Sequence, residues 1–290
     1  MKTNNNQLRT ALFAVTVLVL LTSGLAHADN IYVSCYYGRT IIKFDSSGNR
    51  TIFAGGLNGP TGLAFDSSGN LYAALNWHGD IDKFDLSGND SFFASGLHGP
   101  MGLAFDSSGN LYAANYDDGT IEKFESFGGN GTIFASGSFS MGLACDSSGN
   151  LYAPDIADGT ITKFDSSGNG SIFASGLNST AGLAFDSSGY LYVGNYYGGT
   201  ITKFDSSGNG TVFASVLKDY GTMGLACDSS GNLYVANEVD GTITKFDSSG
   251  NGSIFASGLN APTFIATQVP EPATLLLFGL GAVIIRKFRA

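Results

Sequence analysis

The stretch Gly182-Leu-Ala-Phe-Asp-Ser-Ser-Gly-Tyr-Leu-Tyr-Val-Gly-Asn-Tyr-Tyr-Gly-Gly-Thr-Ile-Thr-Lys-Phe-Asp205 decides the fold of this chain. Its first eight residues recur, with Phe or Cys in the fourth place, beginning at Gly62, Gly102, Gly142 and Gly224. The period is therefore 40 residues, with one step of 42. A fixed period of this length predicts a repeat architecture, in which each unit buries its apolar residues against its neighbours.

Each repeat contains four short apolar segments separated by turns of Gly, Ser, Asn and Asp. In the repeat that starts at Gly102 these segments are residues 102–105, 111–115, 120–124 and 132–135. Short apolar runs between such turns are typical of β-strands. Four strands in a unit of ~40 residues are typical of a propeller blade.

A count of each strand type gives the number of blades. The second strand occurs six times, starting at Ile31, Leu71, Leu111, Leu151, Leu191 and Leu233. The first strand occurs five times as Gly-Leu-Ala, and residues 262–266 supply a sixth copy near the C-terminus. We therefore predict an all-β, six-bladed β-propeller with four antiparallel strands per blade. A C-terminal inner strand pairs with the three N-terminal strands, so that backbone hydrogen bonds close the ring.

The N-terminal residues have the features of a signal peptide. An apolar run over residues 11–21 follows two basic residues and precedes Ala26-His27-Ala28, which has the A-x-A form of a signal-peptidase site. We predict a signal peptide over residues 1–28 and a propeller over residues 29–268. A membrane-spanning anchor is the alternative, although the run is shorter than the ~20 apolar residues that cross a bilayer.

The C-terminal residues form a three-part tail. Pro270-Glu271-Pro272 leads into an apolar run over residues 275–285, and basic residues follow it. Residues 269–290 thus resemble the PEP-CTERM sorting signal. The resemblance implies an exported protein of a Gram-negative bacterium, recognition of Pro270, Glu271 and Pro272 by an exosortase-type processing enzyme, and transient membrane association through the apolar segment.

The same resemblance implies release or attachment at the cell surface. Proteins with this tail are often associated with exopolysaccharide and biofilm. A simple C-terminal membrane anchor is the alternative, and the sequence leaves open whether the tail is cleaved.

The central repeats resemble a second family. Residues 191–205 are similar to the NHL repeat, and residues 182–189 match its opening strand, which implies a six-bladed propeller. The basic residue that NHL proteins commonly carry before the Ile is replaced by Thr120, Thr160, Thr200 and Thr242, so the RNA binding of some members is not implied. Between residues 29 and 269 there are 23 acidic and 9 basic residues, and this charge would repel nucleic acid and anionic lipid.

The turns and loops of such a blade fall on two different faces, because the strands run up and down alternately. Both Asp-Ser-Ser-Gly turns of a blade lie on one face, which we call the turn face. The loops between the second and third strands, and the loops that enter each blade, lie on the other, which we call the loop face. Turn-face sequences are nearly uniform, whereas the loop-face sequences vary.

We predict that ligand binding uses the variable loop face. The candidate residues are Tyr36, Tyr37, Trp77, His78, Tyr116, Asp117, Asp118, Asp158, Tyr196, Tyr197, Glu238 and Asp240. Exposed aromatic rings suit stacking on sugar rings, and Asp, Asn and Glu accept hydrogen bonds from hydroxyl groups. The sequence therefore favours an exported, non-catalytic binding or scaffold module for exopolysaccharide or matrix protein. Loops without a ligand are the alternative reading of the same variation.

Four second strands end in a residue that could bind a metal ion. These residues are Asn115, Asp155, Asn195 and Asn237, and oxygen ligands of this kind suit calcium or magnesium. Six-bladed propellers of the gluconolactonase type have a similar Glu/Asn/Asp centre for lactone hydrolysis. The alternative function is therefore a metal-dependent lactonase or lyase, and the competing reading of the four residues is a capping role at strand ends.

Other catalytic groups are sparse in the predicted mature chain. It holds only His78 and His98, and no Ser-His-Asp arrangement is recognisable from the spacing. Cys145 and Cys227 replace the Phe of the first strand two blades apart, so we expect two buried thiols and no disulfide between them. No organic cofactor is indicated.

Overall fold

The computed structural model describes residues 29–45, 47–126, 128–139, 141–215 and 221–268. The predicted signal peptide (1–28) and the tail (269–290), with Pro270, Glu271 and Pro272, lie outside the described residues. Within the described ranges, no helix has the length and apolar character needed to cross a membrane.

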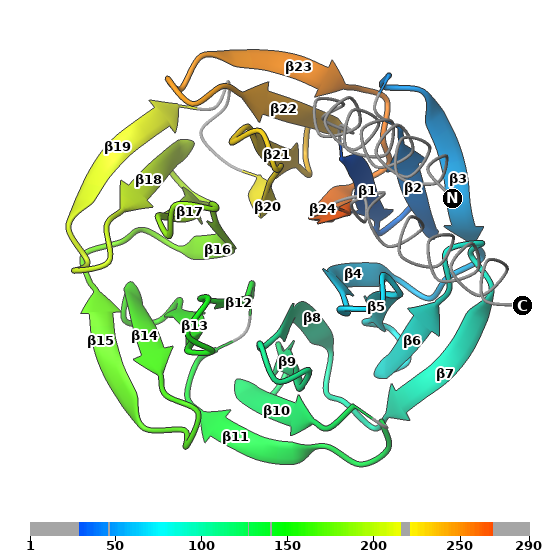
Figure 1. Cartoon of the computed structure of the whole chain (residues 1–290), viewed down its shortest axis with the longest axis horizontal. Helices are drawn as coiled ribbons and strands as arrows, with labels where there is room; N and C mark the ends of the chain where they lie inside the picture. Colours follow the sequence, from blue (N-terminus) through cyan, green and yellow to red (C-terminus); the bar gives the residue numbers. More distant parts are fainter. Residues whose placement is uncertain (1–28, 46, 127, 140, 216–220, 269–290) are drawn as a thin grey trace, which may run out of the picture. The chain divides into compact units, whose positions relative to one another are not determined.

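Six four-stranded antiparallel sheets stand around a central axis as the blades of a propeller (Figure 1). From the innermost to the outermost strand, blade 1 contains β24 (Pro262–Gln268), β1 (Asn30–Cys35), β2 (Thr40–Phe44) and β3 (Arg50–Gly55). Blade 2 contains β4 (Pro60–Phe65), β5 (Leu71–Leu75), β6 (Asp80–Phe84) and β7 (Asp90–Ser95). Blade 3 contains β8 (Pro100–Phe105), β9 (Leu111–Asn115), β10 (Thr120–Phe124) and β11 (Thr132–Ser136).

The other three blades repeat this order. Blade 4 contains β12 (Ala144–Cys145), β13 (Leu151–Asp155), β14 (Thr160–Phe164) and β15 (Gly170–Ala174). Blade 5 contains β16 (Thr180–Phe185), β17 (Leu191–Asn195), β18 (Thr200–Phe204) and β19 (Gly210–Ser215). Blade 6 contains β20 (Thr222–Cys227), β21 (Leu233–Asn237), β22 (Thr242–Phe246) and β23 (Gly252–Ala256). The six-bladed, all-β prediction is confirmed.

The closing strand lies where the sequence predicts it. Strand β24 pairs antiparallel with β1, with Tyr32 opposite Ala266 and Val33 opposite Ile265. The hydroxyl oxygen of Ser34 lies 3.0 Å from that of Thr263 and accepts a hydrogen bond from the backbone N–H of Phe264 at 3.0 Å. Backbone and buried side-chain hydrogen bonds thus join the two ends of the propeller.

The core lies between neighbouring blades and explains why the second strands are mostly apolar. All five residues of β5 are buried, since this strand packs on a blade at each side. Tyr72 of β5 contacts Phe93 and Phe105 edge to face, with ring centroids 4.9 Å apart in both pairs. Equivalent aromatic pairs recur around the ring, and each buried aromatic side chain contributes about 1.5–3 kcal/mol of transfer free energy.

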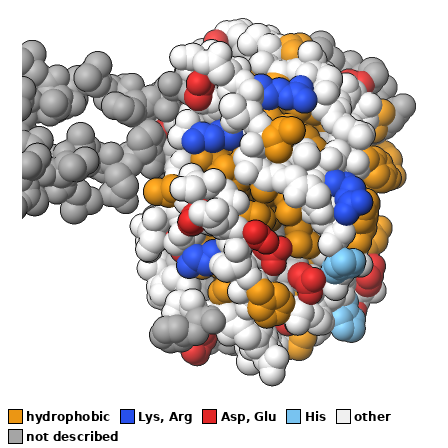
Figure 2. Space-filling model, turned by 90° about the vertical axis from the view of Figure 1, so that its right-hand side faces the viewer, with side chains coloured by type: hydrophobic (Ala, Val, Ile, Leu, Met, Phe, Trp, Pro, Cys, Tyr) orange, Lys and Arg blue, Asp and Glu red, His pale blue; other side chains and the backbone are white. Residues whose placement is uncertain are grey.

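The outermost strands, in contrast, are exposed on one side. Ile52 of β3 and Phe92 of β7 both expose 67% of their surface. Figure 2 views the ring from the side of these two strands and shows hydrophobic side chains across it.

The glycine of the Gly-Leu-Ala sequence marks the closest approach of inner strands. A Cβ at Gly62 of β4 would lie 2.2 Å from the carbonyl oxygen of Met101 on β8, and a Cβ at Gly182 of β16 would lie 2.1 Å from that of Met223. A side chain at either position would overlap the backbone of the next blade. The repeat therefore keeps glycine at this position because two backbones meet there.

The Asp-Ser-Ser-Gly-Asn turns are held by their own aspartate. Asp66 accepts hydrogen bonds at Oδ1 from the backbone N–H groups of Ser68 and Asn70 (2.9 and 2.8 Å). At Oδ2 it accepts from the Asn70 amide (2.8 Å) and the Tyr72 hydroxyl (3.4 Å), and the Lys83 ammonium lies 3.5 Å away. The recurring sequence is therefore turn chemistry, and its carboxylate is already surrounded by donors.

Candidate functional site

The loop face is built from two sets of loops that are hydrogen-bonded to each other. The backbone N–H of Asn76, after β5, donates to the carbonyl of Gly59, which precedes β4 (3.0 Å). In blade 1 the N–H of Tyr36 donates to Ala261 in the same way (2.9 Å). Equivalent bonds occur in blades 3, 5 and 6, so five blades present a pair of joined loops on one surface.

An aromatic cluster joins the loops of blades 1 and 2. Tyr36 contacts Tyr37 and Trp77 edge to face, with ring centroids 5.1 and 5.4 Å apart, and donates from its hydroxyl to the side-chain carbonyl of Asn76 (3.1 Å). The Trp77 ring lies over Gly59, where a Cβ would come within 2.7 Å of the indole nitrogen. Tyr37 remains 64% exposed and Trp77 45% exposed, so the cluster is held in place and is still open to solvent.

Arg39 fixes the cluster from the side. Its Nε donates to the carbonyl of Leu57 (2.9 Å) and a terminal nitrogen donates to Asn58 (3.2 Å), while the guanidinium lies 5.7 Å from the Trp77 ring centroid. A cation over an indole ring is attracted by the electrons of its face. The orientation of Trp77 is therefore set by neighbouring residues on both sides.

A cavity of about 450 Å³ opens on the same face beside this cluster. It spans three blades, because Tyr196 comes from blade 5, Glu238 and Asp240 from blade 6, and Tyr37 and Asn260 from blade 1. Four of the predicted binding residues thus line one cavity. Loops far apart in the sequence meet here because the ring closes between blades 6 and 1.

Glu238 is the half-buried acid of this cavity. Burial raises the pKa of its carboxyl above the ordinary value, and no hydrogen bond or ion pair from the described part of the chain engages the carboxylate. A partly desolvated carboxylate without a donor is costly. A ligand that brings a hydroxyl or an amine would supply the missing donor.

The other predicted loop-face residues lie apart from this cavity. The Nδ1 of His78 is 3.0 Å from the Asn58 amide and 4.0 Å from a carboxylate oxygen of Asp80. The Nδ1 of His98 is 3.3 Å from Asp118, whose other oxygen accepts from the N–H and hydroxyl of Thr120. Figure 2 shows histidine side chains beside acidic ones at one edge. Tyr116 and Tyr197 are more than half exposed, and Asp117 and Asp158 are exposed in their loops.

The predicted metal residues use their side chains within their own blades. The amide of Asn115 donates to Thr120 and Glu122 (3.1 and 2.8 Å), and those of Asn195 and Asn237 donate to threonines on the neighbouring strand. Asp155 accepts from two backbone N–H groups of the following loop. The carbonyl oxygens of Asn115 and Asn195 are buried without a partner.

The predicted metal ring contains three asparagines and one aspartate, so the presence or absence of a cluster of His, Cys, Asp and Glu does not test it. Among the described residues no three His, Cys, Asp or Glu side chains come together as a metal-binding group. The hydrogen bonds fit a role in holding each loop to its strand, and a calcium or magnesium site at Asn115, Asp155, Asn195 and Asn237 stays a prediction.

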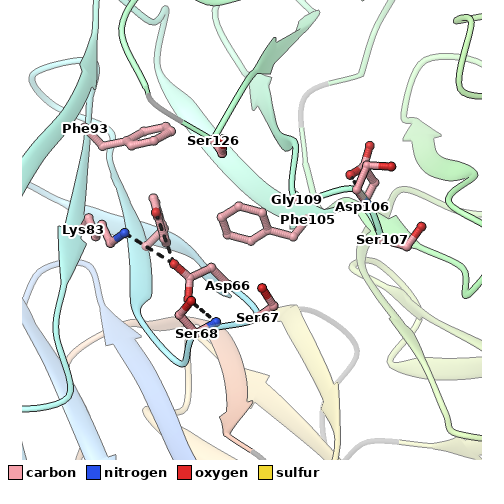
Figure 3. A pocket seen from close by; sticks show the side chains of 12 residues that line it. Asp66, Ser67, Ser68, Lys83, Phe93, Phe105, Asp106, Ser107, Gly109 and Ser126 are labelled. Atoms are coloured by element: carbon pink, nitrogen blue, oxygen red, sulfur yellow. Dashed lines mark hydrogen bonds and ion pairs between the residues drawn. The ribbon is translucent and has the colours of Figure 1, made fainter.

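Sequence reasoning missed a second cavity, which lies on the turn face between blades 2 and 3 (Figure 3). It has a volume of about 410 Å³. Its lining residues are Asp66, Ser67, Ser68, Tyr72, Lys83, Phe93, Phe105, Asp106, Ser107, Ser108, Gly109 and Ser126. The signal that could have located it is a break in the repeat, since the outer turn of blade 3 reads Glu125-Ser126-Phe127-Gly128-Gly129-Asn130 and is one residue longer than the others.

Comparisons with known proteins agree with the fold and the tail. Residues 268–289 match the family model of the PEP-CTERM protein-sorting motif. A search of curated protein sequences found no match. The match to the sorting motif indicates export and surface association in a Gram-negative bacterium, and a processing step by an exosortase.

Solved structures with a similar fold are propellers of different activities. A chain in the crystal structure of a nidogen/laminin complex is 17% identical with a TM-score of 0.73, covering 82% of this chain and 98% of that one. A streptogramin B lyase is 15% identical with a TM-score of 0.63, covering 82% and 86%. Virginiamycin B lyase from Staphylococcus aureus is 13% identical with a TM-score of 0.64, covering 84% and 90%. At these identities the likeness shows the fold alone.

Proposed function

We propose that this protein is an exported polysaccharide-binding module of the bacterial surface or extracellular matrix, which binds its ligand on the loop face. The observation that carries the proposal is the ordered, exposed cluster of Tyr36, Tyr37 and Trp77 beside the cavity that contains Glu238. The match of the tail to the PEP-CTERM sorting motif supports the location.

The chemistry of this surface suits a sugar polymer. Aromatic rings offer flat apolar surfaces to the C–H groups of a pyranose, and Glu238, Asn260 and Asn76 offer hydrogen-bonding groups for its hydroxyls. The cavity and the cluster share Tyr37, so a chain of several sugar units can lie across both. A binding surface that extends from the cavity over the cluster favours a polymer over a single small molecule.

The charge of the loop face narrows the choice of polymer. Carboxylates of Asp117, Asp118, Asp158, Glu238 and Asp240 outnumber the guanidinium of Arg39 in the described loops. Such a field repels anionic chains and attracts neutral or amino-sugar polymers. We therefore expect retention on neutral or cationic glycans and weak retention on uronic-acid polymers.

A glycan array probed with residues 29–268 tests the proposal, since this segment is a compact unit with its own core. Trp77→Ala is the test variant, and Phe92→Ala is the matched control because it removes an exposed aromatic ring from the outer strand β7. We expect Trp77→Ala to weaken glycan binding at least about tenfold, the loss typical of a central aromatic contact. Equal binding by both variants, or no glycan bound by the parent, would contradict the proposal.

Two other outcomes would favour a different function. Retention by matrix protein without glycan would point to a protein partner. Calcium- or magnesium-dependent binding followed by lactone turnover would favour the metal-dependent lactonase or lyase, for which the structure offers no specific support among the described residues.

A further inference from the structure

The cavity on the turn face departs from the repeat in a way that turn chemistry does not require. Five outer turns have the sequence Asp-(Ser/Leu)-Ser-Gly-Asn, and in these the Asp carboxylate accepts two backbone N–H groups, as in Asp85 with Ser87 and Asn89. In blade 3 the turn begins with Glu125 and has an extra residue. The N–H of Gly129 there donates across the blades to the carbonyl of Phe93 (3.0 Å).

This different turn supplies one wall of the cavity. Ser126 comes from it, while Ser67 and Ser68 belong to the inner turn of blade 2 and Ser107 and Ser108 to that of blade 3. All five serines are exposed. Five hydroxyl groups from three turns therefore surround one opening, and each can both donate and accept hydrogen bonds.

The floor of the cavity is aromatic. Phe93 and Phe105 flank Tyr72, and Figure 3 shows both phenylalanine rings directed toward the opening. Beside them, Lys83 lies 3.5 Å from Asp66 and 5.2 Å from the centre of the Tyr72 ring. An apolar floor with a few fixed polar groups is the usual build of a small-ligand site.

The charges of this cavity indicate what it would accept. Lys83 is paired with Asp66 in its lining, and the Asp106 carboxylate accepts from Tyr112 of its own blade. An anionic ligand would therefore meet no unpaired cation among the described lining residues. A neutral polyhydroxylated ring can instead place its C–H face on Phe105 and its hydroxyls among the serines and beside Lys83. These are the contacts that recognise a sugar residue.

We propose that the turn-face cavity between blades 2 and 3 is a second glycan-binding site, opposite the loop face. Together with the loop-face site it makes the propeller bivalent, and this consequence rests on the proposed function. A disc with one sugar site on each face joins two polymer chains. Joint binding of two sites to one network strengthens retention beyond either affinity.

Calorimetric titration with cellohexaose, chitohexaose and mannohexaose separates the two sites. Ser107→Trp and Ser67→Trp place an indole at opposite walls of the cavity. Ser187→Trp is the matched control, because it occupies the same turn position in blade 5. All three serines are exposed, so we expect folded proteins with unchanged melting temperatures.

We expect the parent to bind one of these hexasaccharides at two sites per chain, and Ser187→Trp to do the same. Ser107→Trp and Ser67→Trp should each lose one site, and Trp77→Ala should lose the other. Adding the parent to the corresponding long polymer should raise its viscosity, whereas either single-site variant should not.

The outcomes are distinguishable for the two sites. A single site that Trp77→Ala removes and Ser107→Trp leaves intact would overturn the second site and keep the proposed function. A single site that Ser107→Trp removes and Trp77→Ala leaves intact would support the second site and contradict the loop-face proposal. No binding of any of the three probes would overturn both sites as they are described.

Discussion

Removal of the closing strand tests the feature on which the whole propeller depends. A variant that ends at Asn260 lacks β24, whose Phe264 and Ile265 are 8% and 5% exposed. Burial of these two side chains contributes about 3–6 kcal/mol together, and β1 loses the backbone hydrogen bonds on one of its two edges. Since domains of this kind are stable by about 5–15 kcal/mol, the loss is a large share of the total.

The expected effect is a drop in melting temperature of about 6–24 °C, because each kcal/mol corresponds to about 2–4 °C in a domain of this size. Circular dichroism during heating measures it. The control is a variant that ends at Gln268, which keeps β24. If the two variants melt within about 2 °C of each other, β24 does not close the ring.

A single substitution tests the same closure if the truncated variant fails to fold. Ser34→Ala removes the hydroxyl that pairs with Thr263 and accepts from the N–H of Phe264. Leaving a buried donor without its acceptor costs about 1–3 kcal/mol, which corresponds to about 2–12 °C. A melting temperature equal to that of the parent would show that these hydrogen bonds do not stabilise the pairing of β1 with β24.

Three further outcomes follow from the structure. Burial raises the pKa of Glu238. The protonated carboxyl therefore costs no folding free energy below the pKa of the unfolded chain, and the folded state loses stability as pH rises through the folded pKa. Glu238→Gln should therefore raise the melting temperature near about pH 8 and leave it unchanged near about pH 3.5, while weakening glycan retention. Asp82→Asn is its control, because burial and then Asp90 and Asp80 also raise the pKa of Asp82, and this change should spare retention. Gly62→Ala should cost about 1–3 kcal/mol through overlap with the Met101 carbonyl, whereas Gly55→Ala, whose Cβ would meet nothing closer than 3.8 Å, should not, and chemical denaturation compares the two. Burial raises the pKa of Cys35 to about 11 and those of Cys145 and Cys227 to about 12, so native protein should react slowly with Ellman's reagent, and fast reaction before denaturation would contradict this burial.

The sequence could predict the fold because the repeat reports the topology directly. Counting each strand type separately revealed six blades and placed residues 262–266 in the first of them. The thiols of Cys145 and Cys227 are free, as two first strands in different blades require, but both residues are partly buried and not fully buried as expected. The alternation of turns also assigned each segment to a face, since antiparallel strands leave no other choice.

The parts that the sequence could not supply depend on contacts between blades. Tyr37, Tyr196 and Glu238 are far apart in the sequence and line one cavity only because blade 1 closes against blade 6. The direction of the Asn115 amide, toward Thr120 and Glu122 of its own blade, is likewise invisible in a spacing pattern. Residues that occupy the same place at the end of a strand lie at the same level along the propeller axis. Their spacing in the sequence does not show whether their side chains point toward one another.

The regular Asp-Ser-Ser-Gly-Asn turns and the segments that depart from this sequence have different physical roles. In a regular turn such as that of Asp66, partial burial raises the carboxyl pKa, but hydrogen bonds from Asn70 and Ser68 and the Lys83 ammonium outweigh it and hold the pKa below its usual value. Such a carboxylate stabilises its own blade and has little left to offer a ligand. The loop of Glu238 and the turn of Glu125 follow no such rule, and each borders a cavity. In a chain that repeats one structural unit six times, we therefore expect binding where the unit has been changed.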